Sequence, residues 1–260
     1  MTLDYEDVRY EENDGFVHLT IDREDSGNMF RRQTTLELAD ALRRFRSDRE
    51  LRVAVLTGAG DRFFSLGGEK EPVESLDYSS VLPIVDVYEL IDITPKPILA
   101  AVNGYAIGGG NVLHVVCDLS IASEKAVFRQ VGPMVGSFDA GYGTWYLEDA
   151  IGRKRAKEMW FLNRKYSADE ARDMGLVNDV VPHEDLLPHT EELCRTILAR
   201  GPQAIAGLKT AFSGRHAGVA GQARMGHDLL LPNYLRTEEA EELSSAFSAK
   251  REPNQERFNR

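Results

Sequence analysis

The stretch "KPILAAVNGYAIGGGNVLHVVCDLSIAS", residues 96–123, decides the fold class. It opens with a short apolar run, turns through glycines at 104–110, continues with apolar residues at helical spacing and closes with a second apolar run. This order predicts strand, turn, helix and strand. Parallel strands joined by helical crossovers are the unit of α/β folds, so the stretch predicts an α/β fold.

The chain before this stretch follows the same logic. Residues 6–12 and 16–22 alternate apolar and polar side chains and predict a hairpin. Apolar spacing predicts helices over 34–48 and 82–92, and the β-branched run 53–60 predicts a buried strand between them.

The chain after it changes character. Residues 167–175 predict a helix with a serine N-cap and a C′ glycine, and 176–182 predict a short strand. Farther on, only helical patterns occur. We therefore expect an α/β core over 1–195 and a C-terminal helical region over 196–260 that packs on a neighbouring subunit.

Composition limits the classes of function. The net charge of −11 argues against nucleic acid as a partner. The acidic N-terminus lacks the apolar segment of a signal peptide, and no apolar run approaches the ~18 residues of a membrane span. The two cysteines, Cys117 and Cys194, suggest no disulfide framework, so we expect a reduced, cytoplasmic compartment.

Two glycine-rich turns are candidates for binding. They lie in "FFSLGGEK" (63–70) and "GYAIGGGNVLHVV" (104–116). The second leads into a helix, where unpaired N–H groups favour negative charge. The second turn lacks the G-x-G-x-x-G spacing of a Rossmann site and the lysine of a Walker A loop, which excludes those nucleotide-binding sites there.

A third segment, "QVGPMVGSFDAGYG" (130–143), carries Ser137, Asp139 and Tyr142. Local turn capping is the alternative to catalysis for these side chains. The segment lacks the G-x-S-x-G elbow of serine hydrolases. The histidines have no metal-ligand spacing, so we expect no metal site, and His114, inside an apolar helix, is expected in the core.

These motifs combine in a recognisable way. With "VAVLTGAGDRFFSLGGE", "ARDMGLVNDVVP" and "AFSAKREP", the glycine turns make the chain resemble the crotonase (enoyl-CoA hydratase/isomerase) superfamily over nearly its whole length. "QVGPMVGSFDAGYGTWYL" resembles one branch, that of 1,4-dihydroxy-2-naphthoyl-CoA synthase and 2-ketocyclohexanecarboxyl-CoA hydrolase. The resemblance implies a ββα spiral core with a C-terminal helical region, homotrimers or hexamers, an acyl-CoA thioester substrate and no tightly bound cofactor.

The resemblance also implies catalytic roles. The N–H groups of Gly68 and Gly109 would form an oxyanion hole for the thioester carbonyl. Hydratases of the superfamily carry glutamates where this chain has Val112 and Gly132, which argues against simple hydration. The acid–base chemistry then falls to Ser137 and Asp139, with Tyr142 and Tyr78 as proton donors.

Further residues match family positions in the substrate site. Those around the acyl group are Leu66, Gly67, Gln130, Val131, Gly132 and Trp160. Bicarbonate acts as base beside the equivalent of Gly132 in the synthases. Arg31 and Lys250 match positions near the CoA phosphates, and Lys250 is expected to act on a neighbouring subunit.

Departures from the branch separate three hypotheses. Val131 matches the hydrolases, whereas the synthases have threonine there, so we favour hydrolytic ring opening over ring closure. Met29, Arg32 and Arg129 also depart from the branch. The branch tyrosine falls at Leu235, and Tyr234 lies one residue earlier; this shift motivates a third hypothesis, a non-catalytic binding subunit.

Overall fold

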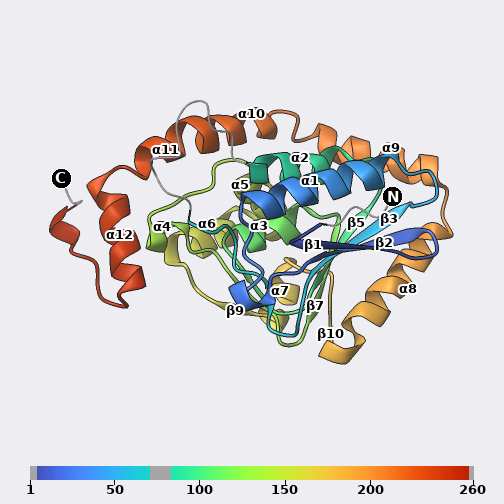
Figure 1. Ribbon diagram of the computed structural model, residues 1–260, viewed down its shortest axis with the longest axis horizontal. Helices are drawn as coiled ribbons and strands as arrows, with labels where there is room; N and C mark the ends of the chain where they lie inside the picture. Colours follow the sequence, from blue (N-terminus) through green and yellow to red (C-terminus); the bar gives the residue numbers. More distant parts are fainter. Residues whose placement is uncertain (1–4, 71–82, 258–260) are drawn as a thin grey trace.

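The strands form two sheets (Figure 1). The computed structural model describes residues 5–70 and 83–257. Within these residues the larger sheet has the order β1 (Val8–Glu12), β2 (Phe16–Ile21), β3 (Val53–Gly58), β5 (Ile98–Val102), β7 (Leu119–Ser123) and β10 (Asp179–Val181). The smaller sheet has the order β4 (Phe63–Ser65), β6 (Tyr105–Ile107), β8 (Val127–Arg129) and β9 (Tyr166–Ser167). All neighbouring pairs are parallel except β1 with β2 and β8 with β9.

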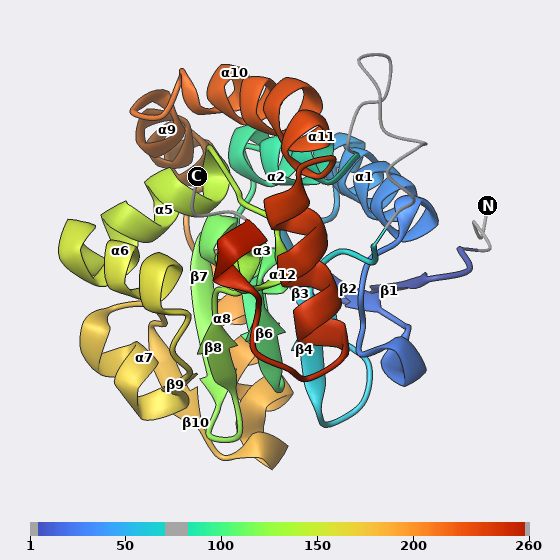
Figure 2. The same cartoon turned by 90° about the vertical axis from the view of Figure 1, so that its left-hand side faces the viewer.

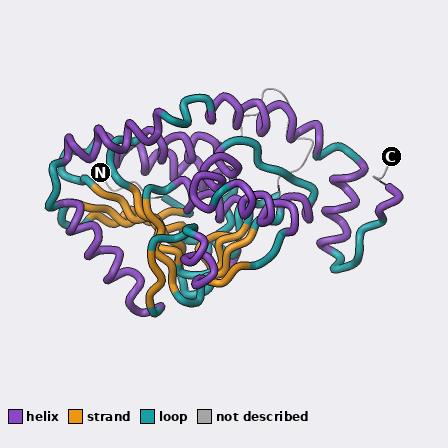
Figure 3. The backbone as a smooth tube through the Cα atoms, turned by 180° about the vertical axis from the view of Figure 1, so that it is seen from behind, coloured by secondary structure: helices purple, strands orange, loops and turns teal. Residues whose placement is uncertain are grey.

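The central strands β3 and β5 are buried at every residue, which explains their continuous apolar sequences. Along β3, Ala54 and Leu56 belong to one apolar cluster, and Val53 and Val55 belong to the other. Figure 3 shows the strands between a thick helical layer and one helix on the opposite side. That helix is α8 (Leu186–Leu198), which joins the second cluster.

The thick layer contains α1 (Arg32–Ser47), α2 (Pro83–Ile93) and α3 (Gly109–Val116). The smaller sheet is flanked by short helices: α4 (Gly132–Val135), α5 (Tyr142–Ile151), α6 (Arg153–Leu162) and α7 (Ala168–Met174). The predicted hairpin, the buried strand after residue 53 and the early helices are confirmed. Ser167 caps α7 by accepting from the Glu170 N–H, and Gly175 ends it with a φ of 85°, both as predicted.

The C-terminal region is helical, as predicted. It comprises α9 (Pro202–Gly214), α10 (Val219–Arg224), a π-helical segment (Met225–Leu230), α11 (Leu231–Tyr234) and α12 (Glu238–Ser248). The expected division after residue 195 falls inside α8, whose Cys194 is buried against the sheet, so the chain leaves the core only after Leu198.

The last helix returns to its own core. Figures 1 and 2 show α12 at one end of the molecule. There it packs on α4, and a Cβ at Gly136 would lie 2.4 Å from the Ala240 carbonyl oxygen. Gly136 also has a φ of 72°, so only glycine suits this contact.

His114, a residue of α3, lies in the core of the protein, as predicted. Its Nε2 is 3.0 Å from Asn111 Oδ1 and its Nδ1 is 3.0 Å from Ser120 Oγ. Complete burial lowers the pKa of His114 to about 3. The unfolded chain therefore binds a proton below about pH 6.5 that the folded chain does not bind.

This difference predicts an acid-sensitive fold. Stability is lost as pH falls through about 6.5, by about 2 kcal/mol for this group between pH 7 and pH 5. His114→Gln should lack this component while keeping a donor toward Asn111. Urea unfolding of both proteins at the two pH values measures the difference. Equal pH dependence in the two proteins would contradict the assignment of His114 as a neutral core residue.

Candidate active site

Two glycine turns, far apart in sequence, touch through their backbones. Gly67 follows β4 and has a φ of 92°. A Cβ at Gly67 would lie 3.0 Å from the amide nitrogen of Gly109 and 3.1 Å from the carbonyl oxygen of Ile107. The positive φ favours glycine, and the close approach leaves little room for a side chain. The turn after β4 is thereby held against the first residue of α3.

Both turns leave an amide free. The Phe30 N–H donates to Gly67 O (2.9 Å) and the Glu69 N–H donates to Phe30 O (3.1 Å). These two bonds use the residues on either side of Gly68, and the Gly68 N–H takes part in neither. Gly109 begins α3, where N–H groups have no partner in the helix. Among residues 5–70 and 83–257, neither the Gly68 nor the Gly109 amide donates a backbone hydrogen bond outside its own element.

Two aromatic side chains flank Gly109. A Cβ there would lie 2.7 Å from Phe30 Cζ and 3.3 Å from Tyr88 Oη. The Tyr88 hydroxyl donates to Gly109 O at 3.1 Å. Burial and the negative charge of Asp139 raise the pKa of Tyr88 well above its usual value. Tyr88 therefore stays neutral and lies between the glycine turn and Asp139.

Asp139 is anchored beside the first turn of α3. Its Oδ1 accepts from the Gly143 N–H at 2.9 Å, and its Oδ2 is 3.2 Å from His227 Nε2. A Cβ at Gly143 would lie 2.8 Å from Asp139 Oδ1 and 2.8 Å from Val112 Cγ2. The carboxylate and Val112 are thus neighbours, and Val112 stands one helical turn after Gly109.

The segment around Gly132 is tightly filled. A Cβ at Gly132 would lie 2.8 Å from Ser137 O and 3.3 Å from Trp160 Cζ3. The Ser137 N–H donates to Gly132 O at 2.8 Å, and Trp160 Nε1 donates to Gly143 O at 3.1 Å. The structure therefore brings Gly132, Ser137 and Trp160 together, and Trp160 links them to Gly143; their role in a site stays a prediction.

Three other predicted residues have different surroundings. Val131 contacts the second turn, because its Cγ2 lies 3.3 Å from where a Gly108 Cβ would be. Leu66 packs on Gly27. Gln130 is 1% exposed, and its side-chain amide has no hydrogen-bond partner within the described chain.

Tyr142 is buried behind Tyr88. Its ring centroid is 5.8 Å from that of Tyr88 and 5.8 Å from that of Tyr146. Its hydroxyl has no hydrogen-bond partner among the described residues and lines a cavity of about 300 Å³ with Glu89 and Asp92. Burial and these two carboxylates raise the pKa of Tyr142. No hydrogen bond joins the Tyr142 hydroxyl to Asp139, so its role as proton donor stays a prediction.

The two remaining tyrosines differ. The Tyr234 ring contacts Phe138 at a centroid distance of 5.5 Å, and its hydroxyl donates to Glu239 Oε1 at 3.0 Å. Burial and Glu239 raise the pKa of Tyr234 to about 12. Tyr234 is thus beside the 136–139 loop even though it is shifted by one residue. Tyr78 lies outside the described residues.

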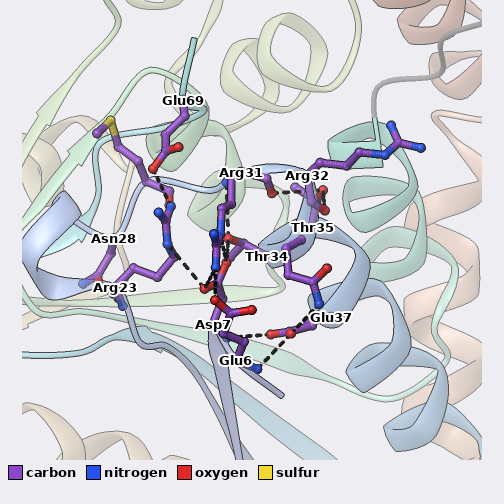
Figure 4. Close-up of polar contacts among 12 residues, drawn as sticks. Glu6, Asp7, Arg23, Asn28, Arg31, Arg32, Thr34, Thr35, Glu37 and Glu69 are labelled. Atoms are coloured by element: carbon purple, nitrogen blue, oxygen red, sulfur yellow. Dashed lines mark hydrogen bonds and ion pairs between the residues drawn. The ribbon is translucent and has the colours of Figure 1, made fainter. Parts of the chain in front are cut away.

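Arg31 is already paired. Figure 4 shows its guanidinium between Asp7 and Glu6, with Nε 2.8 Å from Asp7 Oδ2 and Nη2 2.6 Å from Glu6 Oε1. These two carboxylates raise the pKa of Arg31. Asp7 also contacts Arg23, which reaches Glu69 at 2.6 Å, one residue after Gly68. The cluster therefore braces the first glycine turn, and phosphate binding by Arg31 stays a prediction.

Lys250 is exposed just after α12, with a φ of 52°. The same helix is tied to the first glycine turn, because Lys70 Nζ donates to Ser244 Oγ at 2.5 Å. Lys250 is therefore on an element next to the site, and its contact with CoA stays a prediction.

Sequence reasoning missed Phe30, Tyr88 and His227. Tyr88 belongs to an apolar helical pattern that is typical of core, and Phe30 and His227 carry no chemical signal of their own. Three-dimensional proximity alone identifies them. Within residues 5–70 and 83–257, no helix has the length and apolarity to cross a membrane, and no three ligand-type side chains cluster as a metal site.

The fold, with its parallel sheets and many helices, is that of the crotonase superfamily, a class of acyl-CoA-processing enzymes. A family model described as enoyl-CoA hydratase/isomerase matches residues 11–257, and the chain belongs to that family.

Solved structures agree. A structure of an enoyl-CoA hydratase from Mycobacterium avium subsp. paratuberculosis K-10 matches with a TM-score of 0.83 and 28% identity, covering 96% of this chain and 98% of its own. An enoyl-CoA hydratase/isomerase from Pseudoalteromonas atlantica T6c matches with a TM-score of 0.86 and 27% identity, covering 96% and 99%. A monofunctional enoyl CoA isomerase from M. smegmatis is 32% identical, with a TM-score of 0.70 and coverage of 83% and 97%.

The crowding at Gly132 predicts a costly substitution. Gly132→Ala should lower the free energy of unfolding by about 1–3 kcal/mol, because its Cβ would displace the Ser137 carbonyl or Trp160. Gly207→Ala is the matched control: nothing lies within 4 Å of its Cβ in α9, so it should be neutral or slightly stabilising. Urea titrations of both variants measure this; equal stabilities would contradict the packing described.

Proposed function

We propose that this enzyme breaks a carbon–carbon bond in an acyl-CoA thioester through an enolate, by hydrolytic ring opening of a cyclic β-keto acyl-CoA. One observation carries the proposal: the Asp139 carboxylate is fixed beside Val112, within the first turns of the helix that starts at Gly109. A base is thus next to a pair of unpaired amides, the two parts that enolate chemistry needs.

The amides of Gly68 and Gly109 serve as the oxyanion hole in this proposal. Negative charge develops on the thioester oxygen when the enolate forms, and fixed N–H donors stabilise it as it appears. The α3 N-terminus adds the favourable end of its dipole. Gly67 supports this role, since its contact with the Gly109 amide keeps the two turns adjacent.

Hydration is disfavoured because this chain lacks the acidic side chains that hydration needs. The hydratases that it resembles carry catalytic glutamates where Val112 and Gly132 stand, and neither residue can transfer a proton. Val112 is 1% exposed and apolar, and any side chain at position 132 meets Ser137. Asp139 supplies a carboxylate in the same neighbourhood from another segment.

Ring opening follows from this arrangement in balanced steps. Asp139 takes a proton from water while the water oxygen bonds to the ring ketone carbon. The bond from that carbon to the α-carbon then breaks, and its electron pair enters the thioester as an enolate held by Gly68 and Gly109. Asp139 then returns its proton to the α-carbon, and the carboxyl group formed from the ring ketone ionises, which gives an open-chain acyl-CoA with a new carboxylate and restores the Asp139 carboxylate. Tyr88 is a neutral hydroxyl near this centre.

Ring closure, as in naphthoyl-CoA synthases, is the second candidate, because it uses the same oxyanion hole in the reverse sense. Gly132, Ser137 and Trp160 lie close together and match residues of the synthase pocket, which favours ring closure. The Ser137 carbonyl and the Trp160 ring fill the space that a side chain at position 132 would take. We therefore include no bicarbonate in the proposal.

Trimers or hexamers also belong to the proposal. The C-terminal helices expose large apolar side chains that a subunit interface would cover: Leu208, Phe212, Met225, Leu229 and Leu230, from 51% to 77% exposed. A neighbouring subunit could then bring Lys250 to a second site. Light scattering of the full chain tests this: a mass of three or six chains is expected, and a monomer would contradict it.

Asp139→Asn tests the proposed base. The variant should lose about 10²–10⁴-fold in turnover of 2-ketocyclohexanecarboxyl-CoA, because the amide cannot accept a proton from water. Mass spectrometry of the wild-type product should show the gain of one water. With o-succinylbenzoyl-CoA, the loss of one water would instead support ring closure.

Asp173→Asn is the matched control, because that carboxylate is 76% exposed on α7. It should leave turnover unchanged. A fully active Asp139→Asn variant would end the role of Asp139. Hydration of crotonyl-CoA by the wild type at rates typical of enzymes would overturn the proposal as a whole.

A further inference from the structure

His227 reaches the site from the C-terminal helical region. It lies in the π-helical segment Met225–Leu230, is 8% exposed, and places Nε2 3.2 Å from Asp139 Oδ2. π-Helical turns often occur at functional sites. The two residues are 88 positions apart, so no local pattern links them.

The contact is built by close backbone approach. A Cβ at Gly226 would lie 2.7 Å from Ala140 Cβ, and a Cβ at Gly141 would lie 2.6 Å from Ala223 Cβ. Gly141 also has a φ of 145°. Glycines on both segments therefore allow the 139–143 loop and the 223–227 segment to lie against each other, which brings the imidazole to the carboxylate.

Both oxygens of Asp139 are held by donors. Oδ1 accepts from the Gly143 N–H, and Oδ2 receives the His227 contact. An ionised carboxylate only accepts, so a neutral His227 must carry its proton on Nε2. The Nδ1 atom is buried without a hydrogen-bond partner in the described residues. Each carboxylate oxygen keeps a second lone pair free for a proton.

A positively charged side chain near His227, that of Arg224, is paired with acidic residues other than Asp139. Arg224, one turn before His227, is ion-paired with Asp86 of α2 and lies 3.6 Å from Asp228 and 3.8 Å from Glu89. From α2, Tyr88 faces Asp139 as a neutral hydroxyl. Within the described chain, His227 is thus the ionisable side chain hydrogen-bonded to Asp139.

We propose that His227 is a positioning residue for the catalytic carboxylate. Its Nε2–H fixes Asp139 in one rotamer, aimed at the region beside Val112 and Gly109. The inference rests on the proposed function of Asp139 as base. It also makes docking of the C-terminal helices a condition for activity within each subunit, because the imidazole comes from that region.

A pair of substitutions tests positioning by kinetics. His227→Leu removes the donor and should lower kcat for 2-ketocyclohexanecarboxyl-CoA about a hundredfold, with KM within about threefold of wild type, since a misplaced base affects the chemical step. His227→Gln keeps an N–H at the position of Nε2 and should recover most of kcat. If the leucine variant keeps wild-type kcat, or both variants lose it equally, positioning by the hydrogen bond is overturned.

A spectroscopic test is independent of turnover. In protein labelled with ¹⁵N-histidine, His227 should show the Nε2–H tautomer at pH 7.5, and Asp139→Ala should change its ring shifts. If Asp139→Ala left the His227 ring shifts unchanged, the proposed hydrogen bond between His227 and Asp139 would be overturned. If neither acyl-CoA is turned over, the proposed function fails. The ring shifts alone then decide whether His227 and Asp139 are hydrogen-bonded.

Discussion

The contact between Gly67 and the amide of Gly109 is the constraint on which the site depends. It joins the turn after β4 to the start of α3 at a separation that leaves little room for a side chain, and the φ of 92° at Gly67 favours glycine there. Because β4 and β6 are parallel neighbours, their carboxyl ends meet at one edge of the smaller sheet, and both turns begin there. Phe30, paired with Gly68, and the Arg23–Glu69 ion pair hold the first turn from outside.

In the proposed function, the acid–base side chain beside this fixed pair of amides comes from a different segment of the chain than in the hydratases. The positions of the family's glutamates are buried or crowded in this chain, at Val112 and Gly132. A carboxylate nevertheless reaches the same neighbourhood from the 136–141 loop, as Asp139. The loop is held by the Gly143 amide on one side and by His227 on the other. In the proposed function the backbone donors and the acid come from separate segments, an arrangement that lets one fold support different reactions.

Much of this could be predicted because the deciding signals are local. The apolar runs, the helical spacing and the cap at Ser167 predicted the elements, and the glycine turns predicted where backbone amides stay unpaired. Features that depend on distant packing could not be predicted. β6 is three residues long and gave no separate signal, the core extends through α8 because Cys194 packs on the sheet, and the pairing of Arg31 with Asp7 needs two segments to meet. His227 has no motif, since its partner is on another element.

The central claim is that the Gly68 and Gly109 amides polarise a thioester carbonyl. The direct measurement is the infrared difference spectrum of cyclohexanecarboxyl-CoA, labelled with ¹³C at the thioester carbonyl and bound to the wild-type enzyme. This analogue lacks the β-keto group and so cannot be cleaved. The account predicts a carbonyl stretch at lower frequency than in solution, because two N–H donors weaken the C=O bond. A bound carbonyl that absorbs at the solution frequency would contradict it.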